Sequence, residues 1–106
     1  MITLTFFKSE THYMGFTCKG HSGYAKEGSD IVCASVSSAI QLTAHNLTKF
    51  YPNLVEFCQD EKDVAIELKC VRAFDEADRQ LSALEDFSTY LSAQYSDYFT
   101  LNYLEV

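Results

Sequence analysis

The sequence predicts an α/β (α+β) sandwich with the element order ββαββαβ, in which two helices pack on a mixed or mainly antiparallel sheet. Two observations predict this fold. Short segments alternate apolar and polar residues, as half-buried strands do, and they come in hairpin-like pairs. A longer segment follows each pair, and its apolar residues recur every three or four positions, as in a helix with one buried face. The length of 106 residues fits one domain, residues 1–106.

The first hairpin is predicted at the N-terminus. In residues 2–7, Ile2, Leu4 and Phe6 alternate with threonines, which indicates a strand. Residues 12–20 hold β-prone side chains and follow a polar turn, which indicates a second strand. This alternation predicts that one face of the sheet is less covered than the other. The aromatic side chains of the strands either pack within the monomer or form a dimer surface.

The first helix is predicted from Ile31 to Tyr51, and either Ser29 or Asp30 can cap its start. Pro52 follows directly and ends this helical pattern. The apolar stripe of the helix consists of Val36, Ile40, Ala44 and Leu47, with Phe50 near the same line.

A second hairpin is predicted from residues 54–60 and 63–70, around a polar turn and with Val64 among its apolar residues. Asp75 is the predicted cap of the second helix. The chain closes with a strand at residues 99–106. The apolar stripe of the second helix consists of Ala77, Leu81, Leu84, Phe87, Leu91 and Tyr95.

The formal net charge of −7 argues against direct binding to nucleic acid, because an acidic chain repels a phosphate backbone. It would attract a basic protein or peptide, or serve solubility alone. The apolar runs are too short to span a membrane, and the N-terminus lacks the pattern of a signal peptide. We therefore expect a cytoplasmic protein.

The four cysteines form no C-x-x-C pair. Cys18, Cys58 and Cys70 lie in strand-like segments, where we expect them to be structural. A competing interpretation is a zinc site, although the spacing of its ligands matches no standard pattern. The ligands would be Cys18, His21, Cys33 and His12. We expect neither a metal nor an organic cofactor.

Cys33 falls in the first turn of the first predicted helix. Unpaired backbone N–H groups and the positive end of the helix dipole gather there, which favours a negatively charged sulfur and can stabilise an oxyanion. His21 lies twelve residues earlier, where an imidazole could accept the thiol proton. Spacing alone leaves two interpretations open. The pair is a cysteine-protease dyad, or it is a buried cysteine and an unrelated surface histidine.

Two polar residues near Cys33 have alternative roles. Asp30 either orients His21 as the third member of a triad or caps the helix. Ser37 either forms a hydrogen bond inside the site or bonds a preceding carbonyl of its own helix. The loop between the two predicted dyad residues is rich in glycine, which permits unusual dihedral angles and movement. Its glycines are Gly20, Gly23 and Gly28.

The segment GHSGYAKEGSDIVCASVSSAI resembles the signature of the ribosomal-processing cysteine proteases called Prp. The matching positions are Gly20, His21, Gly23, Tyr24, Gly28, Asp30, Ile31, Val32, Cys33, Ala34, Val36 and Ser37. Ser22 and Ser35 stand where the family commonly has alanine. Because both residues are small, we expect them to change the packing and not the chemistry.

This resemblance implies a cysteine endopeptidase that removes a short N-terminal extension from a large-subunit ribosomal protein, after an aromatic residue. It implies that Cys33 is the nucleophile and His21 the general base, in a homodimer with a mobile loop over the site. The loop would span residues 22–29. The residues assigned to it are Ser22, Gly23, Tyr24 and Gly28, together with Gly20 just before it. The alternative is a non-catalytic, ribosome-associated module that binds a basic protein tail.

Overall fold

A computed structural model describes residues 1–26, 29–60 and 65–106. The predicted element order ββαββαβ is confirmed. The elements are β1 (Ile2–Ser9), β2 (His12–Lys19), α1 (Ile31–Phe50), β3 (Val55–Asp60), β4 (Ala65–Cys70), α2 (Asp75–Gln94) and β5 (Phe99–Glu105). Val64 and Gly28, which carried parts of the predicted hairpin and loop, lie outside the described residues.

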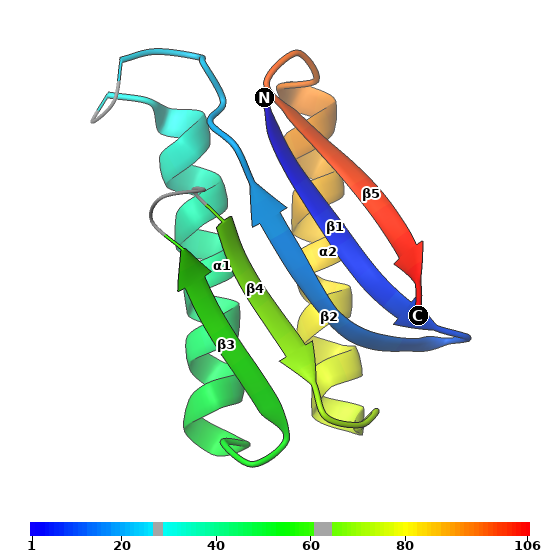
Figure 1. Cartoon of the computed structure of the whole chain (residues 1–106). Coiled ribbons are helices and arrows are strands. Elements are labelled where there is room, and N and C mark those ends of the chain that lie inside the picture. The colour runs from blue at the N-terminus through cyan, green and yellow to red at the C-terminus, as the bar shows by residue number, and fades with distance from the viewer. Residues whose placement is uncertain (27–28, 61–64) are drawn as a thin grey trace.

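The five strands form one mixed sheet in the order β3-β4-β2-β1-β5. Only β1 and β5 pair in parallel; the other neighbours are antiparallel. Both helices cover the same face, α1 behind β3 and β4, and α2 behind β1, β2 and β5 (Figure 1). Phe6, Phe16 and Phe99 are fully buried, so these strand aromatics pack within the chain. Thr3 and Thr5 alternate with the buried residues of β1 and face the uncovered side, as predicted.

The buried stripe of α1 agrees with the prediction except at its end. Its buried residues are Val32, Val36, Ile40, Thr43, Ala44 and Leu47. Phe50 is 65% exposed, so its place near the stripe was predicted wrongly. The next residue, Tyr51, instead packs on Phe74 with ring centroids 5.1 Å apart, which closes this end of the core.

Two predictions for α2 were wrong. Asp75 is the first helical residue and not the cap; the cap position is Phe74, which makes no side-chain capping bond. Asp75 still favours the helix, because a carboxylate in the first turn interacts well with the helix dipole. Phe87 is 44% exposed, and Ser88 takes its place in the buried stripe. Within the described residues, neither helix is long and apolar enough to cross a membrane.

Candidate active site

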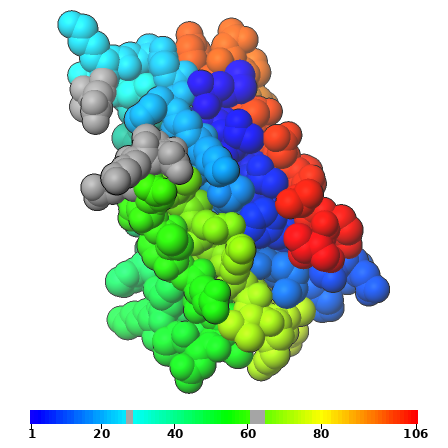
Figure 2. Space-filling model, viewed as in Figure 1, coloured from blue at the N-terminus to red at the C-terminus, as the bar shows by residue number. Residues whose placement is uncertain are grey.

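The chain between β2 and α1 crosses one end of the sheet, beside the N-terminal residues and the turn before β5 (Figures 1 and 2). Gly20 starts this loop with φ of 97°, and Gly23 has φ of 72°. Both values lie in a region that side chains disfavour. A Cβ atom on Gly20 would lie 2.3 Å from the carbonyl oxygen of Met1, so glycine is also required by space. The prediction that glycines shape this loop is confirmed at these two positions.

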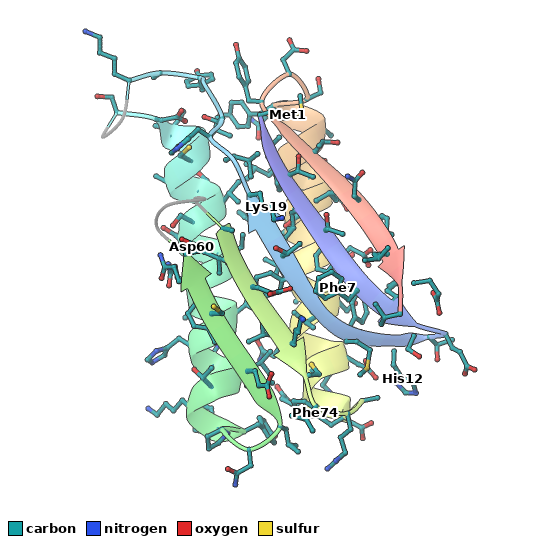
Figure 3. All side chains as sticks on the ribbon, viewed as in Figure 1. Met1, Phe7, His12, Lys19, Asp60 and Phe74 are labelled. Carbon is teal, nitrogen blue, oxygen red and sulfur yellow. The ribbon has the colours of Figure 1, made fainter. Side chains whose placement is uncertain are left out.

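A cavity of about 710 Å³ opens beneath the loop. Both predicted dyad residues, His21 and Cys33, line it. The β3–β4 hairpin also contributes to the cavity, which the sequence analysis did not foresee, because no local signal connects segments this far apart. Figure 3 labels Asp60 and Lys19 at this end of the sheet. The lining residues are Ile2, Cys18, Gly20, His21, Gly23, Ala25, Asp30, Cys33, Ala34, Val36, Ser37, Ile40, Gln59, Asp60, Ala65 and Ile66.

Asp30 is the N-cap of α1. One oxygen of its buried carboxylate accepts hydrogen bonds from the backbone N–H groups of Val32 and Cys33, both at 3.0 Å. The other oxygen accepts the hydroxyl of Ser22. Among the described residues, no hydrogen bond joins Asp30 to His21. Of the two predicted roles, the structure therefore places Asp30 in the capping role.

The same hydrogen bonds control the ionisation of Asp30. Burial alone would raise the pKa of this carboxyl. The Ser22 hydroxyl and the backbone N–H groups of Cys33, Ala25 and Val32 outweigh burial and lower the pKa to about 2. Asp30 is therefore a carboxylate at neutral pH, and it ties the loop to the first turn of α1.

Replacing Asp30 by alanine will lower the melting temperature by roughly 4–8 °C, because the cap and the loop lose a common anchor.

The destabilisation caused by Asp30→Ala will depend on pH. A carboxylate whose pKa is lowered from 3.8 to about 2 stabilises the fold fully above its ordinary pKa and loses that effect as the pH falls through 2. The difference between the two proteins must therefore shrink on acidification. Thermal unfolding followed by circular dichroism measures it, with the exposed Asp86→Ala variant as control. A constant difference across this range would contradict the assignment.

Cys33 is the third residue of α1, and its side chain is half-buried. The helix N–H groups expected to be free are occupied: Asp30 accepts those of Val32 and Cys33 with its side chain and that of Ala34 with its carbonyl, at 3.0 Å. The donor that does reach the sulfur is the backbone N–H of Ser22, 3.4 Å from Sγ. The prediction of Cys33 in the first turn is confirmed, whereas the donor beside it comes from the loop.

His21 is exposed and lines the cavity, but no hydrogen bond among the described residues joins it to Cys33. The structure thus brings the two side chains to one cavity without closing the dyad. Ser37 also lines the cavity and is exposed. Neither predicted hydrogen bond of Ser37 is present in the part of the chain that the structure describes.

Tyr24 fixes the loop to the turn between α2 and β5. Its ring meets those of Tyr95 and Tyr98 edge-on, with centroids 5.6 and 5.1 Å away. Edge-to-face pairs of this kind are favourable beyond the area that they bury. The loop is therefore held at two points, by these rings at the end of α2 and by Asp30 at the start of α1.

The other cysteines differ in their surroundings. Burial raises the pKa of the Cys18 thiol to about 12, with a smaller effect from the neighbouring Cys33 sulfur. Burial likewise raises the pKa of Cys70 to about 11. Cys58 is exposed on β3, so the expectation that it is structural was wrong. Cys18 shares the cavity with Cys33 and remains a neutral thiol there.

The four ligands suggested for zinc do not all gather in one place, because His12 lies away from the cavity that Cys18, His21 and Cys33 line. Nδ1 of His12 lies 2.8 Å from Oδ2 of Asp78 in α2. Figure 3 labels His12 at the opposite end of β2 from Lys19. Within residues 1–26, 29–60 and 65–106, no three histidine, cysteine or acidic side chains are arranged to hold a metal ion.

Comparison with known proteins identifies the family and supports the fold. The family model described as "Cysteine protease Prp" matches residues 1–99. The structure is similar to that of the ribosomal processing protease Prp from Staphylococcus aureus with a covalently linked product peptide, with 22% identity, 98% of this chain and 100% of that one covered, and a TM-score of 0.89. The structure of the same protease with a substrate peptide has 21% sequence identity and a TM-score of 0.84, with 98% of this chain and 100% of that one covered. A protein from Streptococcus mutans has 22% sequence identity and a TM-score of 0.80, with 100% of this chain and 96% of that one covered. None of the curated protein sequences matches significantly. From the family match, the chain belongs to the Prp family of cysteine proteases.

Proposed function

We propose that this cysteine protease removes the short N-terminal extension of a large-subunit ribosomal protein, cutting after an aromatic residue. The observation that carries the proposal is that Cys33, in the first turn of α1, and His21 line the same cavity. The similar Staphylococcus aureus enzyme is a ribosomal processing protease. The net charge of −7 suits a basic ribosomal protein, because opposite charges steer the two molecules together.

In the proposed reaction, His21 accepts the proton of the Cys33 thiol while the sulfur attacks the carbonyl carbon of the scissile peptide bond. The carbonyl electron pair moves onto its oxygen, and the tetrahedral intermediate then expels the amine, which takes the proton from His21. Water then attacks the carbonyl carbon of the resulting thioester while His21 accepts its proton. The C–S bond breaks, and the departing thiolate takes this proton back from His21 as the acid product is released. His21 must approach the sulfur for the first step, so the loop moves when the peptide binds.

Two features of the cavity suit the proposed substrate. The Ser22 N–H, which already reaches the sulfur, can turn to the oxyanion that develops on the attacked carbonyl. The cavity wall includes the apolar side chains of Ile2, Val36, Ile40 and Ile66, which can receive an aromatic ring of the peptide. Because the Ser22 N–H reaches the Cys33 sulfur and the apolar side chains line the cavity that contains Cys33, an aromatic residue before the cut fits this geometry.

A synthetic peptide that copies the extension will be cut once, directly after its aromatic residue. Mass spectrometry of the products identifies the cut. The same peptide with alanine in place of the aromatic residue is the control and should be cut at least about tenfold more slowly, because it leaves the apolar pocket unfilled. Binding without any scission would contradict the proposal and favour a peptide-binding role.

We also propose that the enzyme is cytoplasmic and works as a homodimer. The uncovered face of the sheet supports the second point, because both helices lie on the other face (Figure 1). A monomeric mass in light scattering at micromolar concentration would contradict it.

A further inference from the structure

The hydroxyl of Ser22 lies between the nucleophile and the helix cap. Ser22 is only 3% exposed. The Cys33 thiol donates to Ser22 Oγ across 3.6 Å, and the Ser22 hydroxyl donates to Oδ2 of Asp30. Serine at this position therefore does more than fill space. Its oxygen contacts the sulfur directly.

The hydrogen bonds of this hydroxyl are saturated. A serine hydroxyl has one hydrogen to donate and two lone pairs to accept with. Its hydrogen goes to Asp30, and its lone pairs receive the Cys33 thiol and the backbone N–H of Tyr24, the latter at 3.2 Å. Ser22 therefore presents a lone pair, and not a hydrogen, to the sulfur.

This arrangement favours the protonated sulfur. A thiol can donate to the lone pair, whereas a thiolate facing it would be repelled unless the hydroxyl left Asp30. We propose that Ser22 is a positioning residue that holds the Cys33 sulfur as a thiol in the free enzyme, so that deprotonation awaits substrate binding and the approach of His21. This inference rests on the proposed role of Cys33 as the nucleophile.

Other titratable groups line the same cavity as the sulfur. They are Asp30 at the start of α1, His21 in the loop, Cys18 on β2 and Asp60 at the end of β3, all of which line the cavity with Cys33. Replacing Ser22 by alanine leaves all four in place. It also keeps the backbone N–H that donates to the sulfur, and Asp30 keeps its backbone donors. The substitution therefore removes the hydroxyl together with its hydrogen bonds to Asp30, Tyr24 and the sulfur, and nothing else that lines the cavity.

The test is the pH dependence of the reaction of Cys33 with iodoacetamide, followed by peptide mass spectrometry. The exposed Cys58 in the same chain serves as an internal reference. In Ser22→Ala, the pH at which the rate is half-maximal should fall by about 0.5, corresponding to about a threefold change in the ionisation equilibrium for a weak hydrogen bond. Ser35→Ala is the matched control, because the Ser35 hydroxyl bonds the carbonyl of Ile31 at 2.7 Å and should leave the midpoint unchanged.

A lower midpoint in Ser22→Ala supports the inference, and an unchanged or higher midpoint overturns it. Circular dichroism verifies the fold. If the alanine variant does not fold, Ser22→Gly, which also lacks the hydroxyl, replaces it. Alkylation requires no substrate, so the outcome is separate from the proposed function. A shifted midpoint without peptide cleavage would refute the protease proposal alone, and cleavage with an unshifted midpoint would refute this inference alone.

Discussion

Cys33→Ala will abolish peptide cleavage while the domain stays folded. The expected loss in kcat is at least about 10⁴-fold, because removal of a nucleophile eliminates the covalent step and leaves only binding. The fold should survive. Cys33 is half-buried at the edge of the cavity, and the cap that starts α1 uses its backbone N–H and not its sulfur. Product formation measured by mass spectrometry, with circular dichroism on the same sample, gives both results.

The matched control is Cys58→Ala, which removes an exposed thiol from β3 and should keep full activity. This pair separates the loss of one particular sulfur from the loss of a cysteine in general. Full activity in purified Cys33→Ala would refute the assignment of the nucleophile. Equal losses in both variants would also contradict it.

The strands and helices were predictable because their signals are local. The alternation of Ile2, Leu4 and Phe6 is a property of consecutive residues, and all three are buried. The choice between Phe87 and Ser88 was not predictable, because both positions continue a helical stripe from Leu84. Packing against the sheet decides which of two adjacent positions is buried, and a stripe read from sequence does not contain that information.

Some features of the candidate site were likewise predictable from local sequence, and others depend on tertiary structure. The position of Cys33 in a first turn follows from the Asp30 cap three residues before it, so sequence was sufficient. The approach of Ser22 to the sulfur depends on how the loop folds back, which Gly20 and Gly23 allow but do not specify. The contribution of the β3–β4 hairpin depends on tertiary structure. Sequence thus identified the setting of Cys33, the proposed nucleophile, and its neighbours His21 and Asp30, but not the contact with Ser22 or the side chains of the β3–β4 hairpin.

His21→Ala will reduce kcat for peptide cleavage by about 10²–10⁴-fold, the usual contribution of a general base. The structure adds a second expectation. Because no hydrogen bond among the described residues joins His21 to Cys33 in the free protein, His21→Ala should change the alkylation rate of Cys33 by less than about twofold without substrate. A base that is paired with the thiol before substrate binds would instead affect both measurements.

The control is His45→Ala, since this histidine is exposed on α1 and is absent from the lining of the cavity. Added imidazole should partly restore cleavage in His21→Ala, because the side chain that it replaces is exposed and lines an open cavity. Unchanged cleavage in His21→Ala would remove this residue from the mechanism. Slow alkylation together with slow cleavage would show that the dyad is already assembled in solution. The two measurements thus separate a dyad that substrate completes from one that exists beforehand, and the geometry of the free protein favours the first.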